Sequence, residues 1–600
     1  MNACKRKVTL NHACHPWARV NAGPMNACKF KSILAGLTIA FWAGNSAFAQ
    51  EPIPMEPSGQ PGDKRPPLVE EKPPGPPPKL ILPPPPAPAP KKPGEFPFEG
   101  VYIRKIIVTG STVFSDEELA KVTAPYENRE LTSESLEVLR TDLTLFYITR
   151  GYITSGAVIP DQTVVDGVIS LHIIEGKLKN IGIEDNKYLR DSYYKKRIEL
   201  GAGPPVKIEN LQKRLAILQE DPRLQKINAE LKPGVKPGES DLTLVVEENI
   251  PFKFWTGYDN YIADSVGGDQ VQVTGAATSL TGNGDILSFT YGNAEGLDPK
   301  IDAWYSFPFT ARDITLSLRY RKNDFDSVRD AFKDLDIETD TDVYTVALRY
   351  PAYKSLSQEF ALSLIGEHAK QKTTLLNNPF SFEPGAVKGE VKVTALRFGQ
   401  EWTHRTQKQV IAATSRFSLG IDALDATTRD SGIPDGEFFS WRGQFQWARR
   451  FKPLDTQLIF RTLLQLSNDP LVSLEQAAVG GRYTVRGYPE NFFVRDEAVV
   501  ASLESRISLI RDKSWADYLQ IVPFFDWGWA KNTDFPTPSG PNNIYSVGIG
   551  LRWAATIFPS LRLRPQFEIY YGYKFRDVDI DIENNMQDKG ISFQFALGAF

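Results

Sequence analysis

The chain has 600 residues, enough for several domains, and its 41% apolar and 24% charged residues are ordinary for a folded protein. All three cysteines lie at or before Cys28, which excludes a disulfide framework for the rest of the chain. The formal net charge of −4 argues against nucleic acid as the main partner.

Residues 1–49 are predicted to be an export signal. Lys29 and Lys31 precede an apolar core that is too short to span a membrane as a helix. The tripeptide AFA then forms a small-x-small site, so cleavage is expected between Ala49 and Gln50.

The pentapeptide MNACK stands at residues 1–5 and again at 25–29, which favours Met25 as the true start; a long leader is the alternative. Removing the signal takes away six Lys and Arg and no acidic residue, leaving 63 basic side chains against 73 acidic ones. The cleaved chain contains no cysteine, which suits the oxidising envelope of a bacterium.

Residues 50–97 are rich in proline, and 18 of the 44 prolines lie between Pro52 and Pro93. Such a stretch favours an extended polyproline II conformation and cannot bury a core. We predict a tether in the periplasm, with a disordered leader as the alternative. At ~3.1 Å per residue it reaches on the order of 130 Å.

Residues 101–250 contain the same order of elements twice, over 101–177 and 178–250. The first unit opens with the strand YIRKIIVTG, continues with two helices, and closes with the strands YITSGAVIP and GVISLHIIEG. Ser115 and Glu118 have the spacing of a capping box at the first helix. This order resembles the POTRA domain, an α+β unit whose sheet edges can accept an extended peptide as an added strand.

From residue 251 to 600, segments of about ten residues alternate apolar with polar or small side chains, as in DITLSLRYRK and ISFQFALGAF. Nine of the 11 tryptophans lie between Trp255 and Trp553. Ten residues at ~3.3 Å each, tilted by ~45°, rise about 24 Å, which matches the apolar band of a transmembrane barrel. We predict a membrane barrel of about 16 antiparallel strands, with a soluble all-β fold as the alternative. Turn-rich or acidic stretches such as residues 323–342 are expected to connect the strands.

A loop predicted over residues 468–495 carries Arg482, Arg486 and Arg495 among aromatic side chains. An arginine is costly in hydrocarbon but not inside a polar lumen, so the loop is predicted to fold into the barrel. A solvated surface loop is the alternative. The centre of the loop consists of Val485, Arg486, Gly487 and Tyr488.

The strand VPFFDWGWA is predicted to supply the counter-ion for this loop. Alternation with a period of two puts on the lipid face Phe525, Trp527 and Trp529. The inward face then carries Phe524, Asp526 and Gly528. We predict that Asp526 forms a bidentate pair with Arg486, and that Gly528 leaves room for an incoming side chain.

VRGY at 485–488 and FFDWG at 524–528 match the two hallmark motifs of the POTRA-bearing outer-membrane assembly and translocation superfamily. In that superfamily the arginine of the first motif meets the aspartate of the second inside the barrel. With two POTRA units and a Pro-rich N-terminal region, residues 100–600 resemble the two-partner secretion (TpsB) branch. The resemblance implies export of a large TpsA-like exoprotein, a haemolysin or adhesin, across the outer membrane of a Gram-negative cell, with POTRA domains in the periplasm that capture it.

Two other functions remain open. A barrel-assembly insertase shares both motifs, although such insertases usually carry more POTRA units. A passive porin has no need of periplasmic repeats. Some members of the family plug the pore with an N-terminal helix, but residues 50–97 contain no stretch that favours a helix.

The sequence predicts no catalytic residue, cofactor or metal site. The histidines that remain after cleavage are too scattered to bind a metal together: His172, His368 and His404. Besides the exoprotein, the expected partners are the lipid and lipopolysaccharide of the outer membrane, with no nucleic acid. The protein is expected to be a monomer.

Overall fold

The structure is a computed structural model that describes residues 79–82, 100–328, 335–429, 432–533, 541–557, 563–576 and 585–599. The predicted signal, its cleavage site between Ala49 and Gln50, and most of the Pro-rich stretch lie outside these ranges. Within them, no helix is both long enough and apolar enough to cross a membrane.

The first α+β unit has a three-stranded sheet in the order β3-β6-β5 and a separate pair, β2 with β4. Helix α2 begins with the predicted capping box: the Ser115 hydroxyl accepts a hydrogen bond from the backbone N–H of Glu118, whose carboxylate accepts one from the N–H of Ser115. Leu139, Leu143 and Tyr147 of α3 are fully buried in the core. The elements are β2 (Val101–Ile103), β3 (Lys105–Thr109), α2 (Asp116–Thr123), β4 (Arg129–Leu131), α3 (Ser133–Thr149), β5 (Gly156–Val158) and β6 (Val168–Ile174).

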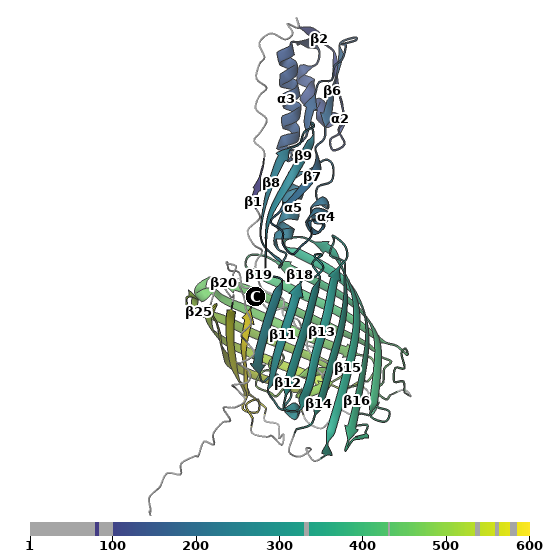
Figure 1. Ribbon diagram of the computed structural model, residues 1–600, viewed down its shortest axis with the longest axis vertical. Coiled ribbons are helices and arrows are strands. Elements are labelled where there is room, and N and C mark those ends of the chain that lie inside the picture. The colour runs from purple at the N-terminus through teal and green to yellow at the C-terminus, as the bar shows by residue number, and fades with distance from the viewer. Residues whose placement is uncertain are drawn as a thin grey trace, which may run out of the picture. The chain divides into compact units, whose positions relative to one another are not determined.

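The second α+β unit forms one sheet that contains β8, β9 and β7 in that order, with α4 and α5 beside it (Figure 1). Tyr194 of α4, Leu211 of α5 and Leu244 of β9 are fully buried in a single core, so burial of apolar surface holds the helices on the sheet. The two α+β units that the sequence predicts are therefore confirmed. The elements are β7 (Lys177–Glu184), α4 (Asp191–Glu199), α5 (Ile208–Gln219), β8 (Leu224–Pro233) and β9 (Glu239–Glu248).

The Pro-rich stretch contributes a strand that its composition did not predict. Strand β1 (Lys79–Ile81) pairs in parallel with β8 at the edge of this second sheet, with Leu80 opposite Ala229. Leu80 packs against the core of the unit. The four residues KLIL lie between two prolines and keep their backbone N–H groups, so they can join a sheet although their neighbours cannot donate to one.

The remainder of the described chain forms a closed antiparallel barrel of 16 long strands, which confirms the predicted fold class. The barrel closes where β10 pairs with β28, with Phe254 opposite Ala599. Figure 1 shows β11 to β16 side by side with a common tilt. Closure gives every strand a hydrogen-bonded neighbour on both sides. No row of backbone N–H and C=O groups is then left without partners in the hydrocarbon of the membrane.

The strands from β10 to β16 are β10 (Phe252–Asp259), β11 (Gln270–Thr278), β12 (Ile286–Ala294), β13 (Leu297–Pro308), β14 (Thr315–Asp326), β15 (Ile337–Lys354) and β16 (Gln358–Leu375). The others are the two-residue β17 (Asn378–Pro379), then β18 (Glu390–Arg405), β19 (Gln409–Gly420), β20 (Phe439–Phe451), β21 (Thr456–Ser467), β24 (Glu497–Lys513), β25 (Ala516–Lys531), β26 (Asn543–Ala554), β27 (Leu563–Lys574) and β28 (Ile591–Ala599).

Side chains alternate between two faces of the barrel. On β12, Leu287, Phe289 and Tyr291 are between 40% and 50% exposed, whereas Ser288 and Thr290 between them are 2% and 4% exposed. The outward apolar side chains suit lipid, and the inward polar ones line the lumen.

Strands β14 and β15 extend into the acidic stretch 323–342, where the sequence analysis expected a connection. β14 runs to Asp326 and β15 begins at Ile337. The prediction was wrong here. Thr339 and Thr341 point inward and alternate with acidic residues, so this segment has the two-residue period of a strand although its side chains are polar on both faces.

Candidate functional site: the inward loop and the barrel wall

The loop at residues 468–495 joins β21 to β24 and folds against the inner wall of the barrel. Val485, Arg486 and Tyr488 at its centre are 0%, 2% and 3% exposed. Val485 and Tyr488 share an apolar cluster with Val500 of β24. Two short strands within the loop pair with each other, β22 (Ala477–Val479) and β23 (Phe493–Arg495).

The structure places Arg486 against Asp526 of β25, and both side chains are buried. The Nε atom of Arg486 donates to Oδ2 of Asp526 at 2.7 Å, and Nη2 donates to Oδ1 at 2.8 Å. The backbone N–H of Arg486 also donates to Oδ2, and the Ser502 hydroxyl donates to Oδ1 at 2.7 Å. Each oxygen of the buried carboxylate therefore accepts two hydrogen bonds, in a bidentate geometry that a lysine cannot provide.

Glu504 of β24 is a second acidic partner of Arg486, which the sequence analysis did not identify. Nη1 of Arg486 donates to Oε2 of Glu504 at 2.8 Å. Glu504 is 1% exposed and also pairs with Arg506 at 2.9 Å and Arg461 at 3.4 Å. A buried carboxylate with three cationic neighbours keeps its charge and orients the guanidinium of Arg486.

Arg482 makes a separate contact between the loop and the wall. Its guanidinium pairs with Glu568 of β27 at 3.1 Å and lies over the ring of Tyr570. Glu568 also accepts a hydrogen bond from the Tyr261 hydroxyl at 2.9 Å. Arg495, the third arginine of the predicted loop, instead donates to the carbonyl of Val494 at 2.8 Å.

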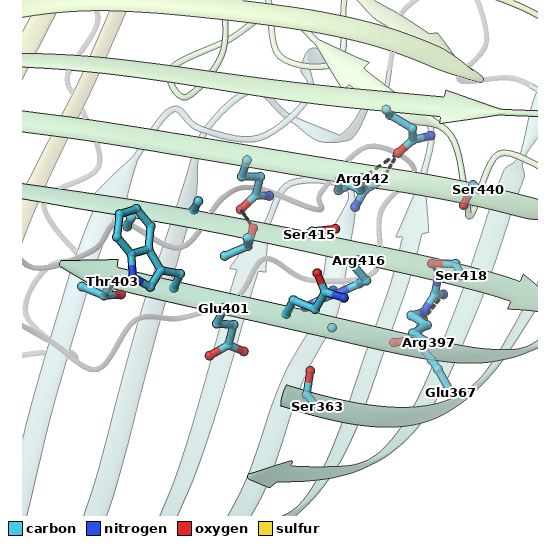
Figure 2. Close-up of a pocket in the computed structure, with 18 of the residues that line it drawn as sticks. Ser363, Glu367, Arg397, Glu401, Thr403, Ser415, Arg416, Ser418, Ser440 and Arg442 are labelled. Carbon is cyan, nitrogen blue, oxygen red and sulfur yellow. Dashed lines mark hydrogen bonds and ion pairs between the residues drawn. The ribbon is translucent and has the colours of Figure 1, made fainter. Parts of the chain in front are cut away.

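A third contact uses an acidic residue of the loop and a basic residue of the wall. Glu475 accepts two hydrogen bonds from Arg397 of β18, at 3.0 Å and 2.7 Å. Arg397 also pairs with Glu367 of β16 at 2.7 Å, and Figure 2 shows its guanidinium between Ser418 and Glu367. Ion pairs thus hold the loop at β18, at β24 and β25, and at β27.

Two glycines allow the loop to approach the wall. A Cβ atom added to Gly528 would lie 2.4 Å from Val479 and 2.8 Å from Val485, so both valines occupy the space that the glycine leaves. Gly487 has a φ of +94°, and a Cβ atom there would lie 2.7 Å from the carbonyl oxygen of Gly572. Gly487 is therefore required both by its backbone conformation and by the close contact with β27.

Residues 238–553 match the family model of the haemolysin secretion/activation protein ShlB/FhaC/HecB, which covers more than half of the chain. The chain belongs to this family. Residues 101–176 match the ShlB-type POTRA domain, within the first α+β unit.

Relatives of the chain with known names are distant from it in sequence. The outer membrane transporter CdiB of Dickeya dadantii is 24% identical over 408 residues, 65% of this chain and 69% of the relative. CdiB of an Escherichia coli strain is 24% identical over 465 residues, 75% of this chain and 76% of the relative. The heme/hemopexin transporter protein HuxB of Haemophilus influenzae is 21% identical over 173 residues, 28% of this chain and 30% of the relative.

Solved structures show a similar fold. The structure of CdiB from Escherichia coli superimposes with a TM-score of 0.62 at 20% identity, covering 85% of this chain and 92% of that one. CdiB from Acinetobacter baumannii gives a TM-score of 0.55 at 15% identity, covering 95% and 96%. At these identities the likeness concerns the fold.

Three acidic residues of the site were missed from the sequence: Glu475, Glu504 and Glu568. A signal for Glu504 existed, because the segment ASLESRISLI places it on the same strand face as Ser502 and Arg506. Glu475 lies in a loop, where no periodicity indicates which way a side chain points.

Proposed function

We propose that this protein exports one large partner protein from the periplasm to the cell surface, as a two-partner secretion (TpsB) transporter. The observation that carries the proposal is a loop held inside a membrane barrel by noncovalent contacts alone, in a chain of the haemolysin secretion/activation family. The barrel lies in the outer membrane of a Gram-negative cell, and the POTRA units lie in the periplasm. Relatives named outer membrane transporter support this location.

The POTRA units capture the partner in an extended conformation. Support comes from β8, whose edge takes up the three residues of β1 as a parallel strand. Backbone hydrogen bonds of this kind bind an extended peptide with little demand on its sequence. A segment of the partner therefore competes with β1 for this edge, or adds to another edge of the two sheets.

The partner then passes through the polar lumen once the inward loop has moved. Arg486, Arg482 and Glu475 hold the loop in place through hydrogen bonds and ion pairs, which can break and re-form without a chemical step. We infer that these three contacts keep the barrel closed at rest, and that a partner at its periplasmic side shifts the loop. Val485, Gly487 and Tyr488 fit the loop to the wall, and Phe524, Asp526 and Gly528 form the surface that receives it.

Folding of the partner outside the cell supplies the free energy, because folded chain leaves the transport equilibrium. The periplasm contains no ATP, and the sequence contains no glycine-rich phosphate-binding motif. We expect no catalytic activity. The apolar outer face of the barrel contacts lipid and lipopolysaccharide, and we expect the protein to act as a monomer.

The proposal is tested by deleting the gene and comparing the proteins on the cell surface and in the medium by mass spectrometry. We expect one large protein to be lost from both, and other outer-membrane barrels to keep their normal levels. Restoring the gene should restore that protein. A general loss of outer-membrane barrels would instead indicate an insertase, and an unchanged set of surface proteins with slower uptake of small solutes would indicate a porin.

A further inference from the structure

Two arginines face each other across neighbouring strands of the barrel wall. Arg416 of β19 and Arg442 of β20 are direct partners in the strand register, and both point into the lumen, since Phe417 and Phe439 on the opposite face are exposed. Directly opposed side chains have their Cβ atoms about 5 Å apart, so like charges there destabilise the sheet. A binding partner with negative charge would remove this repulsion.

The nearby carboxylates are already bound to other arginines. Glu475 and Glu367 both pair with Arg397, and Glu367 also pairs with Arg321 at 3.2 Å. Nε of Arg442 donates at 2.9 Å to the amide oxygen of Gln465, which carries no charge. In the described part of the chain, Arg416 forms no ion pair.

These residues line one cavity of about 240 Å³ on the inner wall, which exceeds the space of several water molecules. Figure 2 shows Arg397, Arg416 and Arg442 around it, on three successive strands. Four arginines and three glutamates line the cavity, and the third glutamate, Glu401, pairs with Arg349 at 2.9 Å. Positive charge therefore exceeds negative charge in the cavity, and Ser440, on the same strand face as Arg442, also lines it.

We propose that Arg416 and Arg442 bind the carboxylates of an acidic polypeptide segment as it passes along the lumen. Glu475 shows how a carboxylate can bind in this cavity, because it accepts two hydrogen bonds from the guanidinium of Arg397. When the inward loop moves, Glu475 leaves Arg397, which keeps Glu367 as a partner, and the cavity loses one negative charge. This inference rests on the proposed export of a polypeptide through the barrel.

The test measures binding of a fluorescently labelled oligoglutamate peptide to the full-length protein in detergent micelles. We expect the wild-type protein to bind the peptide, and Arg416→Gln and Arg442→Gln each to weaken binding about tenfold, the loss expected for one charged hydrogen bond. Arg319→Gln is the matched control, since Arg319 also faces the lumen but its charge is paired with Asp302. Its binding should change less than twofold.

Sodium sulfate and an oligolysine peptide complete the experiment. Sulfate should compete with oligoglutamate, because it offers the same oxygen acceptors, and oligolysine should not bind. Binding of sulfate without oligoglutamate, or equal binding by the wild type and by both arginine variants, would overturn the proposal. Heat-dependent mobility on gels verifies that each variant retains a folded barrel. Because the assay involves no secretion, a failure here with normal export of the partner would refute the anion site and leave the proposed function standing.

Discussion

Replacing Arg486 by alanine removes four side-chain hydrogen bonds from the interior of the barrel, two to Asp526 and one each to Glu504 and Ser502. Glu504 keeps Arg506 and Arg461 as partners. Among the described residues, Asp526 then keeps the Ser502 hydroxyl and the backbone N–H of residue 486 as partners, and no cation contacts it. The stranded charge is therefore that of Asp526, and breaking a buried pair in this way costs about 3–5 kcal/mol.

The assay is equilibrium unfolding of the barrel in detergent micelles, followed by the fluorescence of its tryptophans. We expect Arg486→Ala to lower the free energy of unfolding by about 3–5 kcal/mol. The double variant Arg486→Ala, Asp526→Ala leaves neither charge of the pair without a partner. Its free energy of unfolding should therefore fall by about 2–3 kcal/mol less than the sum of the decreases in the two single variants. Strictly additive losses, or an unchanged stability of Arg486→Ala, would refute the reasoning.

Two further predictions concern the other contacts of the loop. Glu475→Gln should lower the free energy of unfolding by about 1.5–3 kcal/mol, less than Arg486→Ala, because Arg397 still has Glu367 as a partner; a loss as large as that of Arg486→Ala would contradict this ranking. Gly487→Ala should cost about 1–3 kcal/mol in the same assay from its positive φ alone, and the contact with β27 adds to this. Gly366→Ala on β16 is its control, because an added Cβ atom there meets nothing within 4 Å and stability should not fall.

The strand pattern of the barrel could be predicted from the sequence because side chains that face lipid are apolar, whereas side chains that face the lumen are polar. The same alternation predicts which side chains of VPFFDWGWA point inward, so an aspartate on that face had to find a cation. In the structure that cation is Arg486, at 2.7 Å. Where both faces of a strand are polar, as around Thr339 and Thr341, no contrast between apolar and polar side chains distinguishes the strand from a connection.

The other ion pairs between the loop and the wall could not be predicted. Glu475 and Arg397 are 78 residues apart, and Arg482 and Glu568 are 86 residues apart. Their meeting depends on the path of the loop inside the barrel, which no local pattern determines. Strand β1 escaped prediction for another reason, since the surrounding prolines concealed four residues that are able to donate backbone hydrogen bonds.

The central claim, that the inward loop must leave the wall before the partner can pass, is tested most directly by a disulfide lock. A Cβ atom on Gly528 would lie 2.8 Å from Cγ2 of Val485 and 2.4 Å from Cγ1 of Val479. All variants therefore carry Val479→Ala to make room, and in that background the pair Val485→Cys, Gly528→Cys brings the two side chains into the range of a disulfide. The chain after the predicted cleavage site has no other cysteine. We predict that export of the partner stops when this disulfide forms in the periplasm and resumes on addition of a reductant, while both single-cysteine variants export in either condition. Export at the wild-type rate with the disulfide formed would contradict the account.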